Sequence, residues 1–166
     1  MPIFLKQRRT MDIEISRGTG EGPTPLAAFD AALCAAGVGD YNLIILSSVI
    51  PPGSRIVISR HDPCVDDYGC RLYVVLSRAD VEKPGESAWA GLGWTQGADG
   101  RGLFVEEHGE SEPGVRETIR VSLGAMIAVR GGFGPICDEI AGVACHDAPA
   151  CAVVVAVYCS AAWGDQ

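Results

Sequence analysis

Hydrophobic residues occur along this chain in short runs whose spacing predicts a protein built mainly of β-strands. Residues 11–17 alternate apolar and polar side chains, which is the period of a strand with one buried face. Residues 150–160 are apolar almost throughout, which predicts a central strand covered on both faces. The glycine-rich segment 18–23 is expected to be a turn. Further strands are predicted at 43–46, 55–59, 71–77, 87–96, 102–106 and 136–145.

Two segments have the spacing of helices instead. The first should run from Thr24, which can cap it, to Gly37, a natural left-handed terminator. Its apolar residues at helical spacing are Leu26, Phe29 and Leu33. The second should open at Ser111 and end at the pair of glycines 131–132. Its expected buried stripe consists of Val115, Ile119, Leu123, Met126 and Val129.

The elements together predict a single α+β domain over residues 1–166. Short links between strands indicate that most of them are antiparallel. Two helices can cover only part of the sheet surface, so the rest must be buried by sheet packing on sheet or by neighbouring subunits. The apolar fraction of 48% agrees with extensive subunit contacts.

Two adjacent serines, Ser47 and Ser48, follow the predicted strand 43–46, whose apolar residues indicate a short buried strand. Pro51 and Pro52 then stop the strand, because proline has no N–H to donate to a ladder. The two hydroxyls allow two interpretations. They could cap the strand end by bonding nearby backbone groups, or they could take part in chemistry.

The composition narrows the range of partners. A net charge of −8 argues against nucleic acid, because phosphate binding requires a basic face. The first residues precede no apolar segment of a signal peptide, and the run at 150–163 is too short for a membrane helix. We therefore expect a cytoplasmic protein with neither nucleic acid nor a membrane as its partner.

The seven cysteines are an odd number at no regular spacing. In the cytoplasm they are expected to be reduced thiols that pack as small hydrophobes. Cysteines lie near His61 and near His146, but the chain has neither a CxxC nor an HxxxH pair. No metal site is therefore predicted.

Three blocks of the chain resemble the pyruvoyl-dependent arginine decarboxylase family: TPLAAFDAAL at 24–33, NLIILSSVIPP at 42–52 and GLFVEEHG at 102–109. In that family the precursor cuts itself between two serines, and the second serine becomes a pyruvoyl group. The resemblance implies a cut between Ser47 and Ser48, which would give a β chain 1–47 and an α chain 48–166. It also implies a four-layer αββα sandwich assembled as a homotrimer or a dimer of trimers.

A pyruvoyl group would supply the chemistry that an amino-acid decarboxylase needs. Loss of the carboxylate leaves a carbanion, and a ketone joined to the substrate amine can withdraw its electron pair. Pyridoxal phosphate would require a lysine in a suitable motif, and the only lysines are Lys6 and Lys83. In the implied route the Ser48 hydroxyl attacks the Ser47 carbonyl to form an ester. Elimination then releases the first chain, and hydrolysis leaves the pyruvoyl cap.

The resemblance also assigns roles to other residues. Glu106 matches the family's proton donor, and its place after an apolar strand would disfavour the carboxylate form, as such a donor requires. Asn42 is placed close to the cut. Asp30 corresponds to the residue that pairs with the substrate guanidinium, which a carboxylate matches bidentately. The other expected substrate contacts are Leu26, Leu33 and Val49.

The expected activity is conversion of L-arginine to agmatine and CO₂. Plainer interpretations exist for each residue: Asp30 as a solvated helix edge, Asn42 as an amide bonded to the turn before it, and Glu106 as an acid leaving the sheet into solvent. Two departures from the family pattern are the segment 60–78 and His108. They leave open a different substrate such as histidine, or a relative that never matures and acts as an interaction protein.

Overall fold

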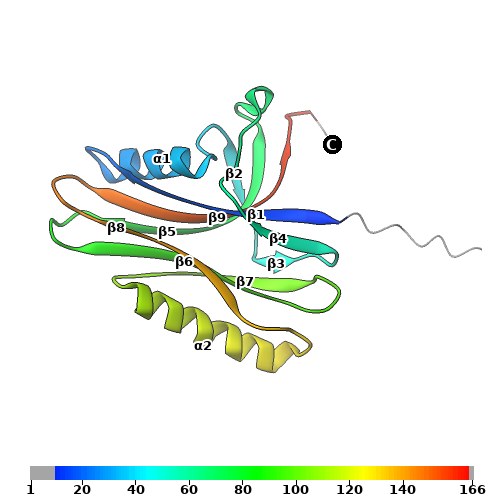
Figure 1. Ribbon diagram of the computed structural model, residues 1–166. Helices are drawn as coiled ribbons and strands as arrows, with labels where there is room; N and C mark the ends of the chain where they lie inside the picture. The colour runs from blue at the N-terminus through cyan, green and yellow to red at the C-terminus, as the bar shows by residue number, and fades with distance from the viewer. Residues whose placement is uncertain (1–9, 165–166) are drawn as a thin grey trace, which may run out of the picture.

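The computed structural model describes residues 10–164, and its elements form four layers in the order helix, sheet, sheet, helix (Figure 1). The five-stranded sheet has the order β2-β5-β9-β1-β4, with β1 (Met11–Glu21), β2 (Asn42–Ile45), β4 (Ser54–Ile58), β5 (Arg71–Val81) and β9 (Ala150–Ala161). The four-stranded sheet has the order β3-β7-β6-β8, with β3 (Val49–Ile50), β6 (Ser87–Gln96), β7 (Gly102–Gly109) and β8 (Cys137–Ala144). Outside the sheets lie α1 (Pro25–Ala36), α2 (Glu112–Arg130) and the 3-10 turn η1 (Val65–Asp67). The predicted α+β class is confirmed.

The strands are mostly antiparallel, and β9 occupies the position predicted for it. The parallel pairs are β1 with β4 and β2 with β5. β9 lies between β5 and β1, and its residues from Ala150 to Val157 are all buried. Alternate residues of β9 face the second sheet and α1, because successive side chains of a strand point to opposite faces. The central strand is therefore confirmed.

β1 continues through residues that the sequence predicts to be a turn. Gly18 and Gly20 extend the strand and lie directly against α1. A Cβ on Gly18 would stand 2.2 Å from the carbonyl oxygen of Ala32, and one on Gly20 would stand 2.4 Å from its nitrogen. The turn prediction is wrong up to Glu21, because these glycines serve close packing of a helix on a strand.

α1 begins and ends as predicted, and two of its predicted apolar residues, Phe29 and Leu33, pack half-buried against the core, although its fully buried residues are alanines. Thr24 Oγ1 accepts a hydrogen bond from the Ala27 N–H at 3.2 Å, and Gly37 ends the helix with a φ of 83°. Its buried residues are Ala28, Ala32 and Ala36. Leu26, the third predicted apolar residue, is 73% exposed.

Val115, Ile119 and Leu123 of the predicted stripe are buried, and α2 packs on β6 and β7. Val129 was expected in the same stripe, but it is 87% exposed, so the buried face ends before the helix does. Within residues 10–164, no helix is both long and apolar enough to cross a membrane.

β2 is an edge strand and not the buried strand that its apolar residues suggest. Of the strands that the structure describes, β2 pairs only with β5, and Ile45 is 58% exposed. An apolar run identifies a strand but does not say what covers it. Beyond β2 the chain crosses to the other sheet and enters β3, which is an edge strand there (Figure 1). The serine pair forms this crossing.

Candidate active site

Ser47 and Ser48 connect an edge of one sheet to an edge of the other. Ser47 is exposed and Ser48 is half-buried. Ser48 has a φ of 56°, and it is the one non-glycine residue with positive φ within residues 10–164. This left-handed conformation costs an L-residue about 1–2 kcal/mol. Such a conformation persists only where the surrounding structure imposes it.

Contacts with β7 fix both the backbone and the side chain of Ser48. Its Oγ donates a hydrogen bond of 2.5 Å to Oε1 of Glu106. Its carbonyl oxygen accepts a hydrogen bond of 2.8 Å from the Phe104 N–H. The next residue, Val49, pairs with Leu103 in the antiparallel ladder between β3 and β7. Backbone pairing with β7 therefore holds the Ser48 hydroxyl against the carboxylate of Glu106, which lies on that same strand.

Glu106 and its neighbour Glu107 point to opposite faces of β7, as alternation along a strand requires. Glu106 faces Ser48, whereas Glu107 accepts a hydrogen bond of 3.0 Å from Ser122 of α2. Both carboxylates are half-buried. The plainer interpretation, in which Glu106 leaves the sheet into solvent, is therefore wrong.

Ser77 of β5 is a residue near the site that the sequence did not single out. Its buried hydroxyl donates to the Glu107 carbonyl at 2.7 Å and accepts from the Gly91 N–H at 3.1 Å. Gly91 and Glu107 are register partners on β6 and β7. Ser77 thus joins the two sheets one residue away from Glu106. The feature of the sequence that could have indicated Ser77 is its hydroxyl at the end of the apolar run 71–77.

This arrangement can activate an alcohol. A carboxylate that accepts the hydroxyl hydrogen bond can take the proton when the oxygen attacks an electrophile. The Ser47 carbonyl, bonded directly to the Ser48 nitrogen, is an electrophile next to that oxygen. The site also fits a ketone made from residue 48, because the Phe104 N–H and Glu106 face this residue. Lys83, the one lysine in the described part of the chain, is exposed and pairs with Glu86 at 3.7 Å.

Asn42 lies at the opposite end of β2 from the serines. Its Nδ2 donates a hydrogen bond of 2.7 Å to the carbonyl of Gly69, and its backbone N–H donates to Cys70 at 2.8 Å. The side chain therefore satisfies a turn, as the plainer interpretation holds. The turn, however, is the one at Gly69 and not the preceding one at residues 39–40.

The other predicted substrate contacts lie on two different parts of the fold. Val49 follows Ser48 directly and is 54% exposed. Asp30, Leu26 and Leu33 belong to α1, which packs on β1 and β9 on the outer side of the five-stranded sheet (Figure 1). Asp30 is exposed and forms no ion pair with any residue of the range 10–164. A single chain brings the serines, Val49 and Glu106 together and leaves the α1 residues elsewhere.

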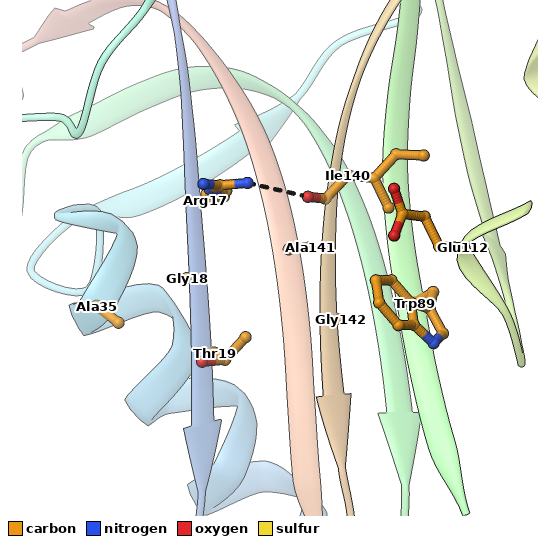
Figure 2. A pocket seen from close by; sticks show the side chains of 9 residues that line it. All are labelled: Arg17, Gly18, Thr19, Ala35, Trp89, Glu112, Ile140, Ala141 and Gly142. Carbon is orange, nitrogen blue, oxygen red and sulfur yellow. Dashed lines mark hydrogen bonds between the residues drawn. The ribbon is translucent and has the colours of Figure 1, made fainter. Parts of the chain in front are cut away.

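A cavity of about 530 Å³ opens between β1 and β8, and Figure 2 shows its lining. β8 is the edge of its sheet opposite to β3, so this cavity does not adjoin the serines. Arg17 projects over it, 3.0 Å from Glu139, and donates to the Ile140 carbonyl at 3.3 Å. None of the predicted site residues lines this cavity, so cavity size does not identify the active site here.

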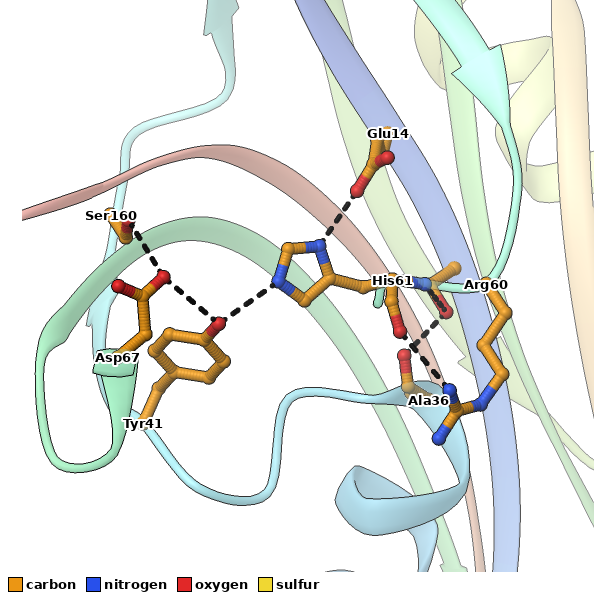
Figure 3. Close-up of polar contacts among 8 residues, drawn as sticks. Glu14, Ala36, Tyr41, Arg60, His61, Asp67 and Ser160 are labelled. Atoms are coloured by element: carbon orange, nitrogen blue, oxygen red, sulfur yellow. Dashed lines mark hydrogen bonds and ion pairs between the residues drawn. The ribbon is translucent and has the colours of Figure 1, made fainter. Parts of the chain in front are cut away.

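The segment that departs from the family pattern is held by a chain of polar contacts (Figure 3). His61 lies 2.7 Å from the Glu14 carboxylate and 3.3 Å from the Tyr41 hydroxyl, which donates to Asp67 at 3.3 Å. Burial, together with the Asp67 carboxylate, raises the pKa of Tyr41 to about 12. Ser160 of β9 donates to Asp67 as well, at 3.3 Å. No three His, Cys, Asp or Glu side chains of residues 10–164 converge as a metal ion would require.

Comparison with known proteins identifies the family of the chain. A model of the pyruvoyl-dependent arginine decarboxylase family matches residues 12–161. The chain belongs to this family. Its members depend on a covalently bound pyruvoyl group, so the chain is an amino-acid decarboxylase with that cofactor. The resemblance found in the sequence is thereby confirmed.

Several curated pyruvoyl-dependent arginine decarboxylases are similar over most of their length. The protein of Halobacterium salinarum is 36% identical over 149 residues, which cover 88% of this chain and 92% of the relative. The protein of Thermococcus kodakarensis is 34% identical over 150 residues, covering 86% and 91%. The protein of Methanocaldococcus jannaschii is 34% identical over 127 residues, covering 72% and 74%.

Proposed function

We propose that this chain is a self-processing arginine decarboxylase that cuts its own backbone between Ser47 and Ser48. The products would be a β chain 1–47 and an α chain 48–166 that begins with the pyruvoyl group. One observation carries the proposal. Ser48 holds a left-handed backbone conformation at the crossing between the sheets, with its hydroxyl bonded to Glu106. The relatives named arginine decarboxylases support arginine as the substrate.

Self-processing begins when Ser48 Oγ bonds to the carbonyl carbon of Ser47 and the peptide C–N bond breaks. The hydroxyl proton passes to Glu106, which already accepts its hydrogen bond, and the freed nitrogen is protonated. Elimination then releases Ser47 as a carboxylate, and hydrolysis at residue 48 releases ammonia. Strain in the left-handed Ser48 favours the first step, because cleavage removes the constraint on that residue.

The two fragments would stay together after the cut. Fragment 1–47 supplies β1, which pairs with β9 from Glu14 to Glu21, and β2, which pairs with β5. It also supplies α1, which covers β9 and β1. Its separation would therefore expose much of the apolar core.

In the mature site, the pyruvoyl ketone would accept the electron pair that remains when CO₂ leaves. Glu106 would return the proton to the substrate carbon, because its half-buried carboxyl faces residue 48. Val49 would form an apolar wall beside the reacting carbon. The product would be agmatine.

We further infer that a second copy of the chain completes the substrate site. Asp30 is exposed on α1, and the apolar residues beside the serines are exposed as well: Ile45 at 58% and Val49 at 54%. A homotrimer or dimer of trimers would cover these residues and could bring Asp30 of one copy to the serines of the next. Its carboxylate would then bind the guanidinium of arginine bidentately.

The intact mass of purified protein tests self-processing. We expect two chains that part on a denaturing gel, with a ketone on the larger one that reacts with hydrazine. Ser48→Ala should leave one uncut chain. A single full-length species after long incubation, without a reactive ketone, would refute the proposal and indicate a relative that does not mature.

Release of CO₂ from arginine and from histidine, measured side by side, tests the substrate. The native mass tests the assembly, which we expect to be three or six copies. Faster release from histidine, or a monomer with full activity, would contradict the corresponding part of the proposal.

A further inference from the structure

Tyr158 reaches the crossing between the sheets from the far side of the core. It lies near the end of β9, in the other sheet from β3, and its hydroxyl donates a hydrogen bond of 2.9 Å to the carbonyl of Val49. Its ring packs edge-on against Phe104, with ring centroids 6.3 Å apart. Phe104 is the residue whose N–H binds the carbonyl of Ser48. Tyr158 therefore contacts Val49, which follows Ser48 in the chain, and Phe104, which binds the Ser48 carbonyl.

Tyr158 donates to the Val49 carbonyl a hydrogen bond that no neighbouring strand of that sheet provides. Successive carbonyls of a strand point to opposite sides, so the Ser48 carbonyl faces β7 and that of Val49 faces away from it. β3 is the edge strand of its sheet, so no strand of residues 10–164 lies on that second side. An edge carbonyl is ordinarily left to solvent. Here the Tyr158 hydroxyl binds it, and the two-residue strand is held on both sides.

We propose that Tyr158 is a positioning residue for self-cleavage. By holding the Val49 carbonyl, it keeps Ser48 in the left-handed conformation that directs its hydroxyl to Glu106. This inference rests on the proposed cut between Ser47 and Ser48. The step that it serves is the first one, in which Ser48 Oγ bonds to the Ser47 carbonyl carbon, the C–N bond breaks, and the hydroxyl proton passes to Glu106.

The surroundings of Tyr158 keep its hydroxyl a donor. Burial, and then the nearby Glu106 carboxylate, raises the pKa of Tyr158 well above its usual value. The phenol therefore stays protonated near neutral pH, where it can donate to the carbonyl of Val49.

The experiment compares full-length wild type with Tyr158→Phe, which keeps the ring and removes the hydroxyl. Cleavage is followed by intact mass after rapid purification. Loss of this hydrogen bond should slow cleavage about three- to tenfold. The matched control is Tyr41→Phe, which removes another bonded tyrosine hydroxyl, the one that donates to Asp67. Tyr41→Phe should change the melting temperature as much as Tyr158→Phe does. Its cleavage rate should nevertheless stay within about twofold of the wild-type rate.

Hydroxylamine separates this step from later ones, because it cuts the ester intermediate. If Tyr158 acts before the ester forms, uncut Tyr158→Phe protein should resist hydroxylamine more than uncut wild type does.

Three results would overturn the inference. Tyr158→Phe could cut at the wild-type rate, the rates of both phenylalanine variants could simply follow their melting temperatures, or the uncut variant could be more sensitive to hydroxylamine. In each case wild type still cuts itself and the proposed function stands. Wild type that never cuts would remove the proposed function and this inference together.

Discussion

Ser48 and Glu106, which are 58 positions apart in the chain, are joined by a hydrogen bond of 2.5 Å between hydroxyl and carboxylate. Glu106→Gln keeps the shape and an accepting oxygen but can neither take up nor deliver a proton, so it should also slow self-cleavage. The matured variant should therefore lose about 10²- to 10⁴-fold in kcat, with little change in the KM for arginine. CO₂ release is measured on protein whose cleavage has been verified by mass.

Glu107→Gln is the control for this variant, because Glu107 faces α2 and binds Ser122. It should keep activity within about threefold, since it removes no contact to the reacting residue. Equal losses in the two variants would show that charge near β7, and not a proton held at residue 48, determines the rate.

Asp30→Asn should raise the KM for arginine about 10- to 100-fold, because one charge-assisted contact to the guanidinium is lost. The value of kcat should change less, since Asp30 is distant from the reacting carbon in the proposed site. Asp40→Asn is a suitable comparison, because Asp40 is also exposed and follows the same helix. Saturation curves for CO₂ release give both constants, and an unchanged KM in Asp30→Asn would remove Asp30 from the substrate site.

Ser77→Ala should lower the free energy of unfolding by about 1–3 kcal/mol, because a buried N–H and a half-buried carbonyl lose their shared partner. These groups belong to Gly91 and Glu107. Ser160→Ala removes an exposed contact to Asp67 and should change the same free energy by less than about 0.5 kcal/mol. Denaturant titration of each variant measures the difference, and similar values for the two would argue against a role of Ser77 in joining the sheets.

Gly18→Ala should destabilise the fold by about 3 kcal/mol or more, because overpacking would drive β1 and α1 apart. The new Cβ would stand 2.2 Å from the Ala32 carbonyl oxygen. Gly124→Ala provides the opposite case, since a Cβ added at this exposed position of α2 would meet nothing within 4 Å. It should stabilise the protein by about 0.5–1 kcal/mol. Melting curves of the two variants should therefore move in opposite directions.

Stability should fall as the pH rises from about 10 to 12, in part through Tyr41. Tyrosine in the unfolded chain titrates near a pKa of about 10, whereas burial and Asp67 raise the pKa of Tyr41 to about 12. Between these values the unfolded chain loses a proton that the folded one keeps, so ionisation favours unfolding. Cys151, whose pKa is raised to about 12 by burial and by Asp80, acts in the same direction.

Tyr41→Phe should therefore reduce, without abolishing, the loss of stability over this alkaline range. Denaturant midpoints of both proteins at several pH values, with tyrosinate absorbance recorded in parallel, measure the effect. Identical slopes for wild type and variant would contradict the role assigned to Tyr41.

The sequence predicts those features that local chemistry determines. Thr24 and Gly37 mark the ends of α1 because capping and left-handed termination depend on single residue types. The uninterrupted apolar run at the C-terminus identifies β9 as central because no other position buries both faces. The family resemblance singles out Ser48 and Glu106, and the structure brings the two side chains together.

Other features depend on contacts between distant segments and leave little trace in the sequence. Gly18 looks like a turn residue because its helical neighbour is separated from it along the chain. Ile45 looks buried because an apolar run does not reveal that its strand lies at an edge. Tyr158 is one aromatic residue in a predicted strand, and only the packing of the two sheets brings it to Val49.

The position of the serine crossing also affects the kinetic stability of the protein. A break there turns one molecule into two polypeptides that share a sheet, with β1 of the shorter piece inserted between β9 and β4 of the longer one. Recovery from denaturation would then require an encounter between separate chains and would depend on concentration. The lifetime of the mature protein would therefore be governed by how slowly β1 leaves the sheet, and not by a reversible folding equilibrium.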